Sequence, residues 1–478
     1  MVVAGSVGLE SIHDFAPPSG PVISWHPSPD SLDKARQAPS SCVPVSHQQA
    51  RHLRNFRAHA TRGVEMARLC IFAWELPGRC DVRAMTYVLN THFRRHDTYH
   101  SWFEFGNDDQ IVRHTVLDPA NIEFVPTKYG EMTPKEWQAH LLAAPSPLQW
   151  DCFRFAVIQH ADSFTCCIAI DHLHIDLTAA GVFHQEIDRM YAALIAGKPP
   201  LILPAAGSYE DYCVRQRKFT SKLTLESSQV RRWVEFFDSN NGSLPSASLP
   251  LGDGLGAGDI IGVQLMDERQ TAQFEAACIA AGTRFSGGVF ACAALAEHQL
   301  TGVEKYYGLV AADTRSTPAE FMTTGWFTGF VPITIPIEPS SFSRMAHAAQ
   351  TSFDLNSDLA HVPFDRILEL APWLKMPPQR VPLLFHVDVG VLAALATSEL
   401  GGSNPRIFRD GGVPARLDIR VHRLKRETHA GIFFPNNPVA RESVKRYLAV
   451  LKSIYAAVVE NFDRASQSRQ GQSNSLCA

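Results

Sequence analysis

The sequence lacks the features that identify several classes of protein. No stretch reaches the roughly 18 consecutive apolar residues that a membrane-spanning helix requires. The net charge of −4 is spread over both signs, without a basic stripe for nucleic-acid phosphates. Neither a P-loop nor a G-x-G-x-x-G fingerprint occurs. We therefore expect a soluble protein with no membrane span, no nucleic-acid partner and no ATP or NAD.

The ten cysteines form no pattern of paired ligands. They are scattered without a C-x-x-C pair, and many lie among apolar residues. Such cysteines are typical of reduced, buried thiols, and they argue against disulfide bonds and against a zinc site. The first residues, MVVAGSVGLESIHDFAPP, contain neither the basic segment nor the apolar segment of a secretory signal. The expected location is the cytoplasm, at most at the inner face of the plasma membrane.

The length of 478 residues exceeds what one hydrophobic core usually organises, so we expect two lobes. Residues 198–208 (KPPLILPAAGS) are typical of a connector, and residues 240–258 are rich in Gly, Pro and Ser. The predicted organisation is an N-terminal lobe over residues 1–204, a helical connector and linker over 205–258, a C-terminal lobe over 259–464 and a disordered polar tail over 465–478.

Apolar residues recur with both strand-like and helix-like periods, which predicts a mixed α/β (α+β) fold class. In the first lobe the patterns predict strands over 69–76, 99–105, 111–116 and 163–170, and helices over 48–64, 82–96 and 183–195. Beyond it they predict helices over 209–237, 270–281 and 289–300, and strands from Ile260 onward and over 306–312.

His172 and Asp176 form an H-x-x-x-D motif where a predicted strand meets a predicted helix. Residues 163–170 (SFTCCIAI) are apolar and partly β-branched, as a buried strand would be, and helical spacing begins after the motif. An imidazole has an ordinary pKa of about 6.5, so at such a turn it can take a proton from a hydroxyl near neutral pH. His172 is therefore the candidate catalytic base.

A second interpretation of the same residues is a metal site. His172, His174 and Asp176 alternate as ligands on a strand would, and such a trio could bind a metal ion. The change to a helical pattern at this point favours acid–base chemistry instead, so we expect no metal. His174 is then a packed, hydrogen-bonded histidine.

Five strings resemble, in the same order, the motifs of the condensation-domain and chloramphenicol-acetyltransferase-like superfamily. They are VPVSHQQ at 43–49, RHDTYHSWF at 95–103, HLHID at 172–176, GWFTGFVP at 325–332 and VPFDR at 362–366. The corresponding superfamily motifs are P-x-S-x-x-Q, RHExLRTxF, HxxxD, GxFxNxxP and LPFxxLV. The resemblance implies two chloramphenicol-acetyltransferase-like lobes, each a mixed sheet with flanking helices, and an active-site channel at their seam.

Within the superfamily the chain resembles the mycobacterial polyketide-associated (Pap) acyltransferases. Strings such as SWHPSP, PLQWDCFRF and FPNNPVARESV carry this likeness. It implies an O-acyltransferase of cell-envelope glycolipid synthesis, which moves a long-chain fatty or methyl-branched acyl group from acyl-CoA, or from a polyketide synthase thioester, to a hydroxyl of trehalose or sulfated trehalose. It implies no cofactor beyond this thioester co-substrate, and a polyketide synthase or a lipid transporter as partner.

The resemblance also assigns roles near the motif. Asp176 is expected to be structural, because a carboxylate at this position tends to pair with a cation or to cap the helix. Its expected partner is Arg315, which resembles the arginine that the family places between HxxxD and GxFxNxxP, and the pair would join the two lobes. The alternative for Arg315 is an exposed arginine in a loop, because single charges are usually solvated. Trp326 and Phe327 are expected in the core. The alternative is that Trp326, Phe327 or Thr328 lines the acceptor channel.

Two residues depart from the superfamily pattern HHxxxDG. Asp171 stands where the first histidine would be, and Leu177 stands where a glycine would ease a tight turn. A carboxylate at Asp171 could instead raise the basicity of a neighbouring imidazole. The departures motivate an alternative function, a non-catalytic module that binds acyl-CoA or a carrier protein. An amide-forming condensation enzyme is a further alternative, which the absence of an adjoining carrier or adenylation signature makes less favourable.

Overall fold

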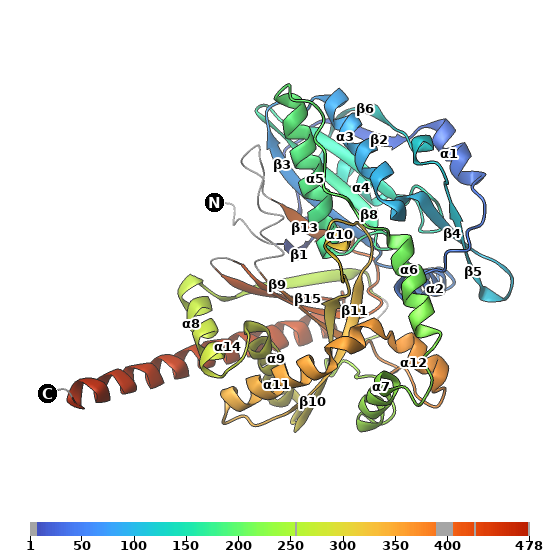
Figure 1. Cartoon of the computed structure of the whole chain (residues 1–478). Coiled ribbons are helices and arrows are strands. Elements are labelled where there is room, and N and C mark those ends of the chain that lie inside the picture. The colour runs from blue at the N-terminus through green and yellow to red at the C-terminus, as the bar shows by residue number, and fades with distance from the viewer. Residues whose placement is uncertain (1–6, 254–255, 389–404, 425–426, 477–478) are drawn as a thin grey trace. The chain divides into compact units, whose positions relative to one another are not determined.

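The computed structural model describes residues 7–253, 256–388, 405–424 and 427–476 (Figure 1). The chain forms two compact units. Unit 1 comprises residues 1–223, 314–328 and 390–413, and unit 2 comprises residues 224–313, 329–389 and 414–478. These units differ from the contiguous lobes expected from the sequence, because the first continues past residue 204 to Leu223 and takes in two later segments.

Unit 1 is built on a seven-stranded mixed sheet. Its order is β1 (Val7–Ser11), β13 (Arg406–Arg409), β3 (Leu69–Pro77), β8 (Ser163–Asp171), β7 (Phe153–Gln159), β2 (Gly20–Pro27) and β6 (Phe124–Met132). β1 and β13 pair in parallel, and the other neighbours in this sheet pair antiparallel. A separate hairpin consists of β4 (Ser101–Phe105) and β5 (Ile111–Thr115).

Unit 1 also contains the following helices, some of which cover the two faces of this sheet. They are α1 (Pro29–Arg36), α2 (His47–Ala60), α3 (Val82–Arg95), α4 (Pro134–Leu142), α5 (Leu177–Ile195), α6 (Tyr209–Thr220) and the short α10 (Pro318–Phe321). α3 and α5 lie side by side (Figure 1) and pack with Ile168 of β8, whereas Ala169 joins a second cluster around Trp137 of α4. Successive strand residues face opposite sides, so the apolar run of β8 is buried on both faces.

Unit 2 contains a six-stranded mixed sheet. Its order is β11 (Thr328–Pro336), β10 (Lys305–Asp313), β12 (Pro382–Val387), β14 (Leu417–Arg423), β15 (Thr428–Pro435) and β9 (Gly258–Met266). Its helices are α7 (Ser228–Ser239), α8 (Glu268–Ala280), α9 (Phe285–Thr301), α11 (Phe342–Asn356), α12 (Phe364–Leu370) and α14 (Pro438–Leu476). β10, β12 and β14 run parallel, and α8, α9 and α14 contact one another within the main core.

Short 3-10 turns complete the described structure. They lie at Ile12–Asp14, Asp97–His100, Asn107–Asp109, Pro119–Asn121 and Ser357–His361. The mixed α/β fold class predicted from the sequence is confirmed, with helices flanking each sheet. The described cysteines are free thiols, and all but Cys42 and Cys70 are buried.

Two predicted segments differ from the structure. The single helix expected over residues 209–237 is two helices, α6 and α7, separated by residues 221–227. The tail expected to be disordered instead continues α14 to Leu476, which projects away from the rest of unit 2 (Figure 1). Its polar composition suggested disorder, but the segment contains no proline, and its Ala, Arg and Gln residues suit a helix. Among the described residues, no single helix is long and apolar enough to cross a membrane.

Three histidines of unit 1 are buried as neutral rings, and this predicts acid sensitivity. They are His92, His174 and His184, each at most 1% exposed. Burial lowers the pKa of each ring to about 4, because a charged ring would lose its hydration. In the unfolded chain these rings titrate near 6.5. Between those values the unfolded state binds more protons than the folded state, so the free energy of unfolding falls as pH falls.

Lowering the pH from 7.5 to 5 should therefore reduce the free energy of unfolding by about 1–2 kcal/mol for each of these histidines. Urea unfolding followed by tryptophan fluorescence at each pH measures this slope. A His184→Leu variant should show a smaller decrease in the free energy of unfolding between pH 7.5 and pH 5 than the wild type, because leucine does not titrate. A free energy of unfolding that stays constant or rises toward pH 5 would contradict the prediction.

Candidate active site

His172 lies in the tight turn between β8 and α5. β8 ends at Asp171 and α5 begins at Leu177. The N–H of His172 donates to the carbonyl of Arg68 at 2.9 Å, and the N–H of His174 donates to the carbonyl of Asp171 at 3.1 Å. The structure thus places the candidate base, half-buried, in the strand-to-helix turn that the sequence predicts.

The ring of His172 packs against the indole of Trp326. The ring centroids are 4.1 Å apart and the ring planes are inclined by 30°, so the indole covers one face of the imidazole. Trp326 is itself buried and lies in the segment 314–328 that belongs to unit 1. An aromatic face stabilises a positive charge placed over it. Trp326 is therefore suitably placed to stabilise a positive charge on His172. The sequence does not indicate this role for Trp326.

Asp176 caps α5 and forms a buried two-point ion pair with Arg315. The two terminal guanidinium nitrogens donate to Asp176 Oδ1 and Oδ2, each at 3.0 Å. Oδ1 also accepts the N–H of Ala179 at 2.8 Å, and Oδ2 accepts the N–H of Phe327 at 2.8 Å. Since these four donors occupy both carboxylate oxygens, the geometry makes Asp176 a structural residue, as the sequence predicts.

The ion pair lies within unit 1, so it does not join the two lobes in the way that the sequence suggests. Arg315 belongs to the segment 314–328, and Asp176 belongs to the first segment of the same unit. Arg315 also donates from Nε to the carbonyl of Glu320 at 3.0 Å. The pair therefore fixes the segment that carries Trp326 to the N-terminus of α5.

Leu177 causes no difficulty in the turn. It is the first residue of α5, and it is not among the described residues with positive φ. The side chain of Asp176 supplies the cap on the N–H of Ala179. A left-handed backbone at this position would require a glycine, and Leu177 does not adopt one. The departure from the superfamily pattern at this position therefore leaves the geometry of the turn intact.

Phe327 is a core residue rather than a channel residue. It is 0% exposed, and its ring packs against Tyr209 and Tyr212, with centroid distances of 5.1 and 4.6 Å. Gly325 makes room for this cluster, because a Cβ there would lie 2.4 Å from Cδ2 of Tyr209. The carbonyl of Thr328 accepts a hydrogen bond from the side-chain amide of Gln48. Trp326, in contrast, packs its indole against the imidazole of His172.

Asp171 organises a buried network beneath the turn, which the sequence does not predict. Its carboxylate accepts from His52 Nε2 at 2.8 Å, from the Arg68 guanidinium at 3.0 Å and from the N–H of Leu173 at 3.2 Å. Burial alone would raise the pKa of Asp171, but the charges and hydrogen bonds of His52 and Arg68 outweigh it and lower the pKa to about 2. Asp171 is thus a carboxylate that holds the backbone next to His172.

His52 brings a second imidazole into this site. It lies on α2, more than 100 residues before the motif, and its ring meets the indole of Trp326 edge-on at 5.6 Å. Its ring centroid is 6.4 Å from that of His172. Since the ionised Asp171 only accepts hydrogen bonds, His52 must carry its proton on Nε2. No local pattern marks His52, because its contacts are all made across the fold.

The metal trio considered from the sequence does not form. His174 is 1% exposed, and its Nδ1 pairs with the hydroxyl of Thr98 at 3.1 Å. Both carboxylate oxygens of Asp176 are engaged by Arg315. His174 is therefore the packed, hydrogen-bonded histidine that the sequence analysis expects.

Another cluster of possible metal ligands consists of His92, His96 and Glu186. Oε2 of Glu186 lies 2.9 Å from His92 Nδ1 and 3.0 Å from His96 Nε2, and Oε1 accepts from Arg95 at 3.0 Å. The backbone N–H of Thr324 donates to His96 Nδ1, so His96 must carry its proton on Nε2. A metal ion at Nε2 would need that proton on the other nitrogen. The cluster is therefore a hydrogen-bond network that links α3 to α5.

Comparison with known proteins agrees with this geometry. The family model "Condensation domain" matches residues 43–377. The chain is 49% identical to "Acyltransferase PapA3" of Mycobacterium tuberculosis over 96% of this chain and 98% of that protein. It is 50% identical to "2'-acyl-2-O-sulfo-trehalose (hydroxy)phthioceranyltransferase PapA1" of the same species, over 94% and 88%.

A third relative is similar to this chain in sequence, and a solved structure with the same protein name is similar to it in fold. "Trehalose-2-sulfate acyltransferase PapA2" of M. tuberculosis is 51% identical over 94% of this chain and 96% of that protein. The solved structure of "PapA2 acyl transferase" superposes with a TM-score of 0.91 at 50% identity, and the match covers 95% of this chain and 99% of that one.

Proposed function

Because this chain belongs to the condensation-domain family and to its Pap acyltransferases, we propose that it transfers a long-chain fatty or methyl-branched acyl group from a thioester to a hydroxyl of trehalose or sulfated trehalose. The observation that carries the proposal is the placement of His172, held in its turn between β8 and α5 with one face against Trp326. The acceptor class is that of the relatives PapA1 and PapA2, whose names refer to sulfated trehalose.

The chemistry requires one proton carrier and two substrates. His172 takes the proton of the sugar hydroxyl as the oxygen attacks the thioester carbonyl carbon. The tetrahedral intermediate collapses, the carbon–sulfur bond breaks, and the imidazolium returns the proton to the leaving thiolate. The products are a sugar ester and a free thiol. The reaction is balanced without an acyl-enzyme and without a cofactor, and Trp326 stabilises the transient charge on His172.

The donor in this proposal is acyl-CoA or an acyl chain on a polyketide synthase. Both present the same thioester carbonyl, so the chemistry at His172 is the same for either. A polyketide synthase or a lipid transporter would be the protein partner, and the reaction would take place in the cytoplasm at the inner face of the membrane.

Mass spectrometry of products from trehalose and trehalose-2-sulfate, each with a series of acyl-CoA chain lengths, tests the proposal. The expected result is one new ester and one equivalent of free CoA thiol per turnover, with one of the two acceptors preferred. Tight binding of acyl-CoA without ester or free CoA would favour a non-catalytic binding module. Faster reaction with an amine acceptor than with either sugar would favour amide-forming condensation.

A further inference from the structure

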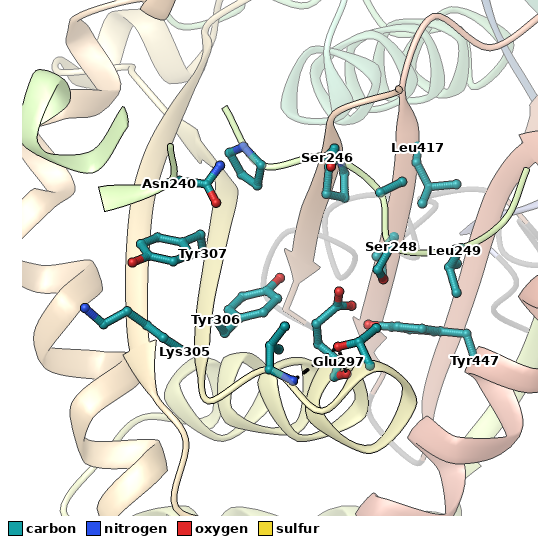
Figure 2. Close-up of a pocket in the computed structure, with 16 residues that line it drawn as sticks. Asn240, Ser246, Ser248, Leu249, Glu297, Lys305, Tyr306, Tyr307, Leu417 and Tyr447 are labelled. Atoms are coloured by element: carbon teal, nitrogen blue, oxygen red, sulfur yellow. Dashed lines mark hydrogen bonds between the residues drawn. The ribbon is translucent and has the colours of Figure 1, made fainter. Parts of the chain in front are cut away.

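A cavity of about 250 Å³ lies in unit 2, at the amino ends of the parallel strands β10, β12 and β14 (Figure 2). Its walls come from these strands, from α9 and α14, and from the segment between α7 and β9. His172 and its neighbours belong to unit 1, and none of them lines this cavity. The cavity is therefore separate from the acyl-transfer site proposed above.

Three polar groups turn toward the same space in this cavity. Figure 2 shows the carboxyl of Glu297 on α9 facing the hydroxyls of Tyr306 on β10 and Tyr447 on α14. The two tyrosines are only 8% and 2% exposed. Within the described ranges, neither hydroxyl has a hydrogen-bond partner in the protein, and Glu297 has no ion pair. The two hydroxyls and the carboxyl thus keep hydrogen-bonding capacity that faces the cavity, and their convergence points to a polar ligand.

The surroundings hold the ring of Tyr306 in place and keep its hydroxyl protonated. A Cβ at residue 308 would lie 2.6 Å from Cε1 of Tyr306, so Gly308 provides the room that its ring occupies. Burial and the nearby charge of Glu297 raise the pKa of Tyr306, which keeps its hydroxyl as a donor. Burial raises the pKa of Glu297, and a hydrogen bond from Ser248 opposes this shift.

The chemistry of the walls excludes several kinds of ligand. Among the residues that the structure describes, no arginine lines the cavity. Its one described lysine, Lys305, is exposed and lies over the ring of Tyr307 at 5.7 Å. An anion would therefore find no positive charge beside Glu297. An alkyl chain would cover the Glu297 carboxyl and the two tyrosine hydroxyls without adding a hydrogen bond to any of them, which is unfavourable. An ammonium ion prefers the faces of aromatic rings, whereas Tyr306 and Tyr447 present their hydroxyls (Figure 2).

We propose that this cavity binds an uncharged polyhydroxylated ligand, one ring of a sugar, at a second site that is not catalytic. Glu297 accepts hydrogen bonds from the sugar hydroxyls, and Tyr306 and Tyr447 donate to them. Apolar side chains such as Leu417 and Ile419 face the C–H surface of the ring. The cavity volume of about 250 Å³ is sufficient for one sugar ring. The inference does not depend on the identity of the acyl acceptor.

Isothermal titration of the full-length protein with glucose and with trehalose tests this site. Glu297→Gln and Tyr447→Phe should each weaken sugar binding at one site about tenfold, because each removes a hydrogen-bonding partner while preserving side-chain size. The matched control is Lys305→Gln, which changes a charge at the rim and should leave sugar affinity unaltered. Thermal unfolding of each variant checks that the fold is preserved.

Acyl transfer at saturating acceptor separates this site from the catalytic one. The Glu297→Gln and Tyr447→Phe variants should retain the wild-type rate, since neither residue belongs to the site around His172. If the chain proves not to transfer acyl groups at all, the difference in sugar binding between these variants and the wild type would still be measured. Failure of the proposed function and failure of the second site are thus distinguishable.

Three results would overturn the proposal. The first is no saturable binding of either sugar by the wild-type protein. The second is an unchanged sugar affinity in both cavity variants, which would place any bound sugar elsewhere. The third is preferential binding of choline, with loss in Glu297→Gln, because the cavity would then be a cation site.

Discussion

Replacement of His172 with alanine should lower the rate of acyl transfer by about 10²- to 10⁴-fold, the range over which one positioned general base contributes. The variant loses the group that takes the hydroxyl proton, while its fold should persist, because the network of Asp171 and the cap of Asp176 hold the turn without that imidazole. A His172→Gln variant, which nearly preserves volume but cannot act as a base near neutral pH, should be equally impaired.

Steady-state assays with trehalose or trehalose-2-sulfate measure this loss, and the effect should appear in kcat more than in KM. The matched control is His13→Ala, which removes an exposed imidazole from the 3-10 turn at Ile12–Asp14. The control should retain the wild-type rate. Full activity in His172→Ala would show that another group performs the proton transfer, and His52 would be the next residue to replace.

The part of the site that could be predicted from the sequence is the part made by neighbouring residues. His172 and Asp176 lie within one turn, and the change from strand-like to helix-like spacing around them marks that turn. The stacking of Trp326 on His172 and the bond of His52 to Asp171 have no local signature, because each joins segments more than 100 residues apart. Arg315 was expected from the family resemblance, not from periodicity.

The difference between local patterns and contacts of distant segments also explains which parts of the fold were predicted. β3 and β8 have clear periodic patterns and appear within one residue of their expected bounds, and α5 ends at Ile195 as expected but begins six residues earlier, at Leu177. β13 is short, and its place between β1 and β3 depends on pairing with residues at the other end of the chain. Local patterns carry no information on such pairing, and for this reason the sequence predicted contiguous lobes.

Loss of the Asp176–Arg315 pair should cost about 3–5 kcal/mol of unfolding free energy, because truncating one partner leaves the other charge buried and unpaired. Asp176→Ala removes the acceptor of both guanidinium bonds and of the N–H groups of Ala179 and Phe327. Arg315→Met should cost a similar amount, because it leaves the carboxylate without its cation. Urea unfolding at pH 7.5 measures both losses.

The double variant Asp176→Ala with Arg315→Met decides whether burial of unpaired charge is the cause. Removing both charges should cost clearly less than the sum of the single losses, since no isolated charge remains. The exposed pair of Asp33 and Arg36 is the matched control, and breaking it with Arg36→Ala should cost less than about 1 kcal/mol. Additive single losses would contradict the buried-charge account.

Activity should fall even in Asp176→Asn, which preserves side-chain size, because the same carboxylate ties the segment that carries Trp326 to the turn of His172.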